Sequence, residues 1–286
     1  MQTNAPKIIV GVDSTGGSTA AVDWAMRAAS AQRATLRILH GFSPDQPGFS
    51  FGMDTSSAMI RTAHGHMLDR VAKHARAFDT SVLVETLQSD SYPAKMLVRA
   101  SADASLVVVG VQGDSHLGFS SVGQTAAQVA SHAQSPVAIV RGGSGEQHPY
   151  GVVTVGMDLS PAACAALERA FDEAERAECT LSVVYAWQPR DSQDPHLRRS
   201  NWADYTATCE QRVRASLEVQ QRTHPDVKVT VEVTRGNPTR VLADRSESSD
   251  LLVVGARGSG GFDGLRLGQV ARDLITHAHC TLVIDR

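Results

Sequence analysis

Two glycine patterns in this sequence have a spacing that would let the backbone come close to a bound phosphate group. The pattern G-x2-G-x9-G follows an apolar run twice. Its glycines are Gly110, Gly113 and Gly123 in the first copy and Gly255, Gly258 and Gly268 in the second. A glycine at a strand end lets the backbone approach a ligand without a Cβ in the way. The third glycine opens a helical pattern, whose free N–H groups and dipole favour an anion. The alternative is that these glycines only make turns.

An aspartate ends the first strand candidate of each half of the chain. The stretches "IIVGVDS" and "VTVGMDL" place Asp13 and Asp158 directly after apolar runs. In an open parallel sheet, ligands bind beyond the carboxyl ends of the strands. Aspartate is also a common turn and capping residue, so a structural role for either side chain is the alternative.

The chain is one unit written twice. A constant offset of 145 residues relates the two glycine patterns, and it also relates the pairs Asp13 and Asp158, Pro93 and Pro238, His132 and His277, and Arg141 and Arg286. A fixed period of this kind indicates duplication without net insertion. We therefore predict a first domain over residues 1–143, a linker rich in Gly, Ser and Pro over 144–151, and a second domain over 152–286.

Short apolar runs alternate with amphipathic stretches in both halves. The predicted strands are 8–12, 35–40, 81–86, 106–110 and 137–140, followed by 154–157, 181–185, 227–233, 251–255 and 281–284. Ser160 followed by Pro161 is a good N-cap and first-turn pair for one of the intervening helices. Continuous Val/Ile/Leu strands between helices favour a parallel sheet covered on both faces. The predicted fold class is α/β, with two tandem doubly wound domains, each a five-stranded parallel sheet with helices on both faces.

The composition argues against several classes of function. The chain has 286 residues, 42% of them hydrophobic, and a formal net charge of −3. Binding of nucleic acid or an anionic membrane normally needs a basic surplus, so neither is expected as a partner. No apolar run reaches membrane-spanning length and no signal-peptide pattern begins the chain. With four cysteines and no C-x-x-C pair, a cytoplasmic location is expected.

Histidines and other phosphate motifs supply no stronger candidate. The Walker pattern G-x-x-x-x-G-K-[ST] is absent, and so is G-x-G-x-x-G after the first strand. His64 and His66 lie two apart, so on a helix they do not face the same way, and no metal site is predicted from them. His132 and His277 end the last helical pattern of each half, where a cation is favourable.

The strand-end aspartates, the repeated glycine loop and the final strand "SPVAIVR" together resemble the universal stress protein family, specifically its tandem-domain, ATP-binding branch. The resemblance covers nearly the whole chain. It implies that the aspartate after the first strand contacts the adenosine part of ATP. It further implies that the residue ending the second strand lies by the adenine and that the glycine loop holds the phosphates.

Carried over residue by residue, the resemblance implies two adenine-nucleotide sites. The first consists of Asp13, Gly41, Gly110, Gly113, Gly123, Gln124 and Thr125. The second consists of Asp158, Ala186, Gly255, Arg257, Gly258, Gly268, Gln269 and Val270, with Arg257 included for its charge inside the loop. The family pattern usually has Ser or Thr after its third glycine, whereas both halves have Gln here. The glutamine amide could donate to phosphate in place of the hydroxyl, with Mg²⁺ accompanying ATP.

The resemblance predicts a cytoplasmic, ATP-binding regulatory protein of a stress response that works through unidentified protein partners and forms a homodimer. A non-catalytic interaction module of the same fold, with one or both sites empty, is the alternative. An enzyme such as a slow ATP hydrolase is a third class. No P-loop lysine, identifiable general base or acidic metal pair supports efficient turnover, so no catalytic residue is predicted.

Overall fold

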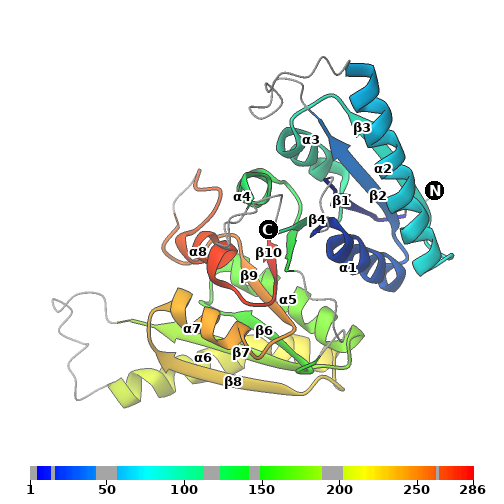
Figure 1. The fold of residues 1–286 in the computed structure, drawn as a ribbon. Coiled ribbons are helices and arrows are strands. Elements are labelled where there is room, and N and C mark those ends of the chain that lie inside the picture. Colours follow the sequence, from blue (N-terminus) through cyan, green and yellow to red (C-terminus); the bar gives the residue numbers. More distant parts are fainter. Residues whose placement is uncertain are drawn as a thin grey trace. The chain divides into compact units, whose positions relative to one another are not determined.

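The computed structural model describes residues 5–13, 17–42, 57–111, 123–141, 149–188, 202–261 and 264–286. The chain forms two compact units, Met1–Ser144 and Gly145–Arg286 (Figure 1). Residues 144–148 of the predicted linker lie outside the described ranges, and so does Gly113.

The first unit contains a parallel sheet with the strand order β3-β2-β1-β4-β5. Its strands are β1 (Lys7–Gly11), β2 (Thr35–Gly41), β3 (Val84–Ser89), β4 (Leu106–Gly110) and β5 (Val137–Val140). Two helices pack on one face of the sheet, α1 (Gly17–Gln32) and α2 (Ser57–Phe78). Two more pack on the other face, α3 (Pro93–Ala100) and α4 (Gln124–His132), with a short 3-10 turn η1 (Ser101–Asp103) after α3.

The second unit repeats this arrangement, with the strand order β10-β9-β6-β7-β8. Its strands are β6 (Val152–Gly156), β7 (Thr180–Trp187), β8 (Val229–Arg235), β9 (Leu251–Gly255) and β10 (Thr281–Asp285). Its helices are α5 (Pro161–Arg176), α6 (Trp202–Thr223), α7 (Pro238–Ser246) and α8 (Gln269–His277). Helices α5 and α6 pack on one face, and α7 and α8 pack on the other.

This architecture confirms the predicted α/β class with a parallel sheet between two helical layers. The central strands explain this architecture. The sequences of β4 and β9 are LVVVG and LLVVG, and all four apolar residues of each strand are buried. Strands that are apolar on both faces need helices on both faces. Winding reverses between β1 and β4 and again between β6 and β9, and ligands of such sheets bind at this switch point.

Local signals near the switch point also agree with the structure. Ser160 is the N-cap of α5, its hydroxyl accepts the Ala163 N–H, and Pro161 occupies the first helical position. His132 and His277 lie in the last turns of α4 and α8, as predicted.

The outermost strand opposite β5 or β10 in each unit begins later than predicted. β3 covers Val84–Ser89 where 81–86 was predicted, and β8 covers Val229–Arg235 where 227–233 was predicted. Only one residue of β3 and none of β8 is buried, so the apolar pattern that locates the central strands is weak in both.

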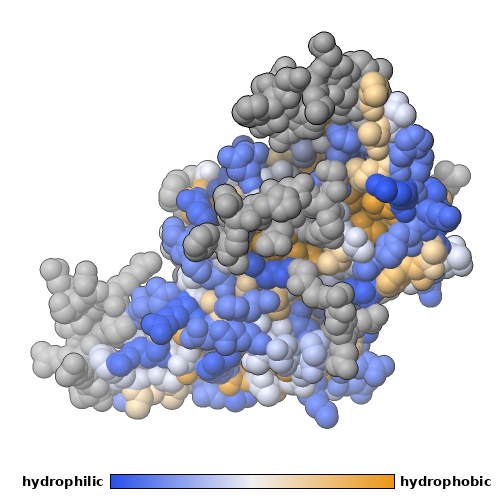
Figure 2. Space-filling view, viewed as in Figure 1, coloured by the Kyte–Doolittle hydropathy of each residue, from blue (hydrophilic) through white to orange (hydrophobic). Residues whose placement is uncertain are grey.

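Large apolar side chains fill both cores, among them Ile38 and Leu39 in the first unit and Phe171 and Leu181 in the second. Figure 2 shows hydrophilic residues over most of the second unit's face in view. No helix among the described residues is long and apolar enough to cross a membrane.

Candidate functional site

The best-defined candidate site lies where β6 and β9 end side by side in the second unit. The two strands pair in parallel, so their carboxyl ends share one edge of the sheet. Asp158 comes two residues after β6, and the loop with Arg257 and Gly258 follows β9. The structure therefore brings together an aspartate and a glycine loop that are 100 residues apart in sequence.

The Asp158 carboxylate joins the two strand ends. One oxygen, Oδ1, accepts the backbone N–H of Ser160 at 3.0 Å. The other, Oδ2, accepts the backbone N–H of Ser259 at 2.6 Å. Hydrogen bonds to a carboxylate are stronger than those between neutral groups. Asp158 therefore fixes the start of the glycine loop beside the end of β6.

Position 258 has room only for a glycine, because the Asp158 carboxylate occupies the space that a side chain would need. A Cβ built at Gly258 would lie 2.6 Å from Asp158 Oδ2. This is closer than real Cβ contacts come, so any larger residue displaces the carboxylate from its bond to Ser259. Asp158 and Gly258 thus depend on each other.

Gly255 serves helix packing. A Cβ there would lie 2.7 Å from both the carbonyl carbon and the carbonyl oxygen of Ala162, in the first turn of α5. This approach places the Ser160 N-cap next to the loop, where the Ser160 hydroxyl contacts the Arg257 carbonyl oxygen at 3.5 Å.

Gly268 leaves its surroundings open. It is the N-cap of α8, and the nearest atoms to a Cβ built there are 3.5 Å away, an ordinary contact distance. Within the described part of the chain, no side chain caps this helix. Gln269 donates its amide N–H to Asp273 on the same helix at 2.7 Å, and Val270 follows in the first turn. The first N–H groups of a helix have no partner within the helix, and at the start of α8 no described side chain caps them.

Positive charge gathers beside this loop. Burial lowers the pKa of the Arg286 guanidinium, and the positive charges of Arg257 and Arg266 lower it further. Arg257 and Arg266 are exposed. Like charges that lie close together repel one another, so an anion that binds among these arginines would relieve the repulsion.

The predicted first site is described in part. The Asp13 carboxylate accepts a hydrogen bond from the Ser18 hydroxyl at 2.7 Å, and the Asp13 N–H donates to the same hydroxyl oxygen at 2.9 Å. Gly41 ends β2 against α3, where a Cβ would lie 2.9 Å from the Pro93 Cα. Gly113 lies outside the described residues, and the other predicted residues lie at the end of β4 and the start of α4, namely Gly110, Gly123, Gln124 and Thr125.

Ala186, the counterpart of Gly41, is half-buried near the end of β7. It carries a Cβ where Gly41 has none. The two units therefore differ at the position where the resemblance places the adenine.

Comparison with known proteins assigns the family. The model of the universal stress protein family matches residues 5–141 and again residues 149–286. The chain belongs to the universal stress protein family. With two family domains in one chain, it is of the tandem type.

Relatives of this universal stress protein match along nearly their whole length. Universal stress protein Rv2623 of Mycobacterium tuberculosis is 32% identical, over 98% of this chain and 96% of the relative. A universal stress protein of Mycolicibacterium smegmatis is 31% identical, with the same coverage. The crystal structure of a universal stress protein from Archaeoglobus fulgidus has the same fold, with a TM-score of 0.70 at 18% identity over 98% of this chain and 96% of that one.

The first domain of this universal stress protein contains a histidine pair that sequence reasoning missed. His40 Nδ1 lies 2.9 Å from the Val12 carbonyl oxygen, next to Asp13. The ring of His64 on α2 meets the His40 ring edge-on at 4.6 Å between centroids. His40 Nε2 and His64 Nδ1 are buried and have no hydrogen-bond partner in the described structure. Burial lowers the pKa of His64, and the neighbouring His40 lowers it further.

Acid should therefore destabilise the first domain. Since the pKa of His64 is lower in the folded than in the unfolded chain, the unfolded chain binds this proton more readily. The stabilisation is complete above the ordinary histidine pKa of about 6.5 and is lost as the pH falls below it. Hydrogen exchange of β2 between pH 7.5 and 5 measures the effect. His64→Cys, which introduces the residue that Cys209 provides in the second domain, should lose less protection over this range. An equal loss in both proteins would contradict the role of His64.

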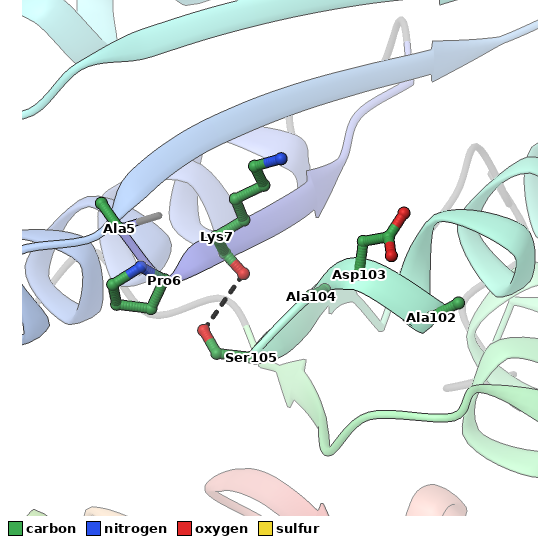
Figure 3. A pocket seen from close by; sticks show the side chains of 7 residues that line it. All are labelled: Ala5, Pro6, Lys7, Ala102, Asp103, Ala104 and Ser105. Atoms are coloured by element: carbon green, nitrogen blue, oxygen red, sulfur yellow. Dashed lines mark hydrogen bonds between the residues drawn. The ribbon is translucent and has the colours of Figure 1, made fainter. Parts of the chain in front are cut away.

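Other features of this universal stress protein lie away from the switch points. A hollow of about 590 Å³ is lined by Lys7, Asp103 and Ser105 at the amino end of β1, where the Ser105 hydroxyl donates to the Lys7 carbonyl oxygen (Figure 3). It faces the opposite edge of the sheet from Asp13. The four cysteines are free thiols. The described residues contain no group of three or more His, Cys, Asp or Glu placed to hold a metal ion.

Proposed function

We propose that this universal stress protein binds ATP at the switch point of each domain and acts as a cytoplasmic, nucleotide-dependent regulator in a stress response. The observation that carries the proposal is the bond from the Ser259 N–H to the Asp158 carboxylate. It fixes the glycine loop beside the aspartate to which the family resemblance assigns the adenosine.

Different residues of the second site would contact different parts of the ligand. Asp158 and Ala186 stand at the ends of neighbouring strands and would contact the nucleoside. The uncapped start of α8, with Gly268 open beside it, would hold phosphate through backbone N–H groups. Arg257 would add a charge-assisted contact to the same phosphates. Mg²⁺ would enter with ATP and offset part of the phosphate charge.

The proposal assigns no catalytic role, because the sequence has no Walker lysine to stabilise a leaving phosphate. It includes a homodimer and protein partners that respond to the bound nucleotide. The second candidate function is an interaction module with one or both sites empty. One observation favours it: the Gln269 amide, which stands where the family usually has a hydroxyl, is bonded to Asp273.

ATP should raise the melting temperature of nucleotide-free protein. A ligand that binds only the folded state at a hundred times its Kd stabilises it by about 2.7 kcal/mol. GTP should stabilise the protein as well, and pyrimidine triphosphates less. Asp158→Ala should reduce the shift, whereas Asp226→Ala, which removes an exposed carboxylate elsewhere in the domain, should leave it unchanged.

Protein that purifies with bound nucleotide would release it on denaturation. The supernatant of denatured protein is therefore first checked for adenine nucleotide. A melting temperature that millimolar ATP does not move, in protein shown to be empty, would favour the interaction module.

A further inference from the structure

A second hollow in the second domain contains no residue of the proposed nucleotide site. It is an open surface hollow with a volume of about 490 Å³. The ends of β7 and β8 and the first turns of α6 form it. Its lining residues are Trp187, Trp202, Ala203, Thr206, Ala207, Glu210 and Arg235.

The walls of this pocket are two indoles and a cation. Trp187, at the end of β7, is 5% exposed, and its ring meets Tyr205 edge-on at 4.6 Å. The Arg235 guanidinium lies over the ring of Trp202, 4.0 Å from its centre. A guanidinium stacked on an indole keeps its edge free to bind an anion in the plane of the group.

The charge of Arg235 is not neutralised by the rest of the pocket. Glu210 is bonded to Arg214 through both Nε and Nη2, at 2.9 and 2.7 Å. No carboxylate forms an ion pair with Arg235 among the described residues. The indole N–H of Trp187 is buried and likewise has no acceptor there. The pocket thus offers an apolar wall and one cation, and its carboxylate, Glu210, is paired with Arg214 instead of Arg235.

The matching place in the first domain carries an ion pair instead. The 145-residue offset aligns Arg235 with Asp90 and Thr206 with Arg61. Asp90 and Arg61 form a salt bridge of 2.5 Å between the end of β3 and α2. The fold therefore does not require an unpaired cation at this position, where Arg235 has no carboxylate partner among the described residues.

We propose that this pocket binds a small planar aromatic carboxylate. The aromatic body would lie against Trp187 and Trp202, and the carboxylate would pair with Arg235. Trp187 directly follows Ala186 of the proposed nucleotide site on β7, and successive side chains of a strand point to opposite faces of the sheet, so the two sites do not share side chains.

Calorimetry with 1-naphthoate as the probe tests the proposal, in the presence of saturating ATP. The wild type should bind one equivalent per chain. Arg235→Gln should weaken binding about fivefold or more, since it removes one charge-assisted pair. Arg222→Gln, which removes an exposed cation near the far end of α6, should bind as the wild type does.

The neutral analogue 1-naphthalenemethanol separates charge from stacking. Its weaker affinity should be unaffected by Arg235→Gln and reduced by Trp202→Leu. The proposal is overturned if 1-naphthoate fails to bind at millimolar concentration, if Arg235→Gln binds it as tightly as the wild type, or if ATP displaces it. Because 1-naphthoate is measured directly, protein that binds no ATP would still give a clear result for this pocket.

Discussion

Replacing Gly255 with alanine should destabilise the second domain by about 3 kcal/mol, at the upper end of the usual effect of overpacking a core. The added Cβ would stand 2.7 Å from the Ala162 carbonyl carbon and oxygen. Backbone in the first turn of α5 cannot move aside as a side chain end can. The helix must shift, and with it the Ser160 cap and its contact with the loop.

Hydrogen exchange in urea measures this effect domain by domain, since a two-domain chain need not unfold in one step. Protection of β9 and β6 should fall, while protection of β4 in the first domain should not. The matched control is Gly268→Ala, whose Cβ would meet only ordinary contacts at 3.5 Å and whose effect should stay below about 1 kcal/mol. If the two variants lose stability equally, the close approach of Gly255 to α5 is not what requires a glycine there.

The three glycines of the second loop show how far the sequence could predict the site. The repeated spacing located the loop, and the structure places Gly258 beside Asp158. The pattern could not show which neighbour takes the place of each missing Cβ. The neighbours differ: a helix packs against Gly255, a carboxylate lies beside Gly258, and the space around Gly268 is open. The sequence shows a glycine in all three cases. The neighbour of Gly255 is more than 90 residues away along the chain, so only the fold identifies it.

The fold itself was largely predictable, because parallel strands buried on both faces must be apolar throughout. Prediction was weakest at β3 and β8, where little of the strand is buried and the hydrophobic pattern fades. The pairing of His40 with His64 and the stacking of Arg235 on Trp202 join residues from different elements. No local period marks such pairs, so the sequence alone gave no signal for them.

The two proposed sites should differ in affinity, with the second binding ATP about tenfold more tightly or better. From Gly110 to Gln124 the only charged residue is Asp114, a net charge of −1. From Gly255 to Gln269 two arginines and one aspartate give +1. A unit charge about 4 Å from a phosphate contributes roughly 1 kcal/mol in water and up to about 4 near a protein surface. Even the lower figure, over a difference of two charges, exceeds the 1.4 kcal/mol or so that corresponds to tenfold in affinity.

Calorimetry on nucleotide-free protein separates the two sites through matched variants. Gly258→Glu displaces the Asp158 carboxylate and should leave only the weaker site. Gly113→Glu, at the corresponding position of the first loop, should leave only the tighter one. Arg257→Gln should narrow the difference in affinity between the sites, as should higher salt, because Arg257 and Arg266 are exposed. Arg222→Gln serves as the charge-matched control. A loss of affinity that is equal in the two glycine variants, or larger in Gly113→Glu, would show that loop charge does not rank these sites.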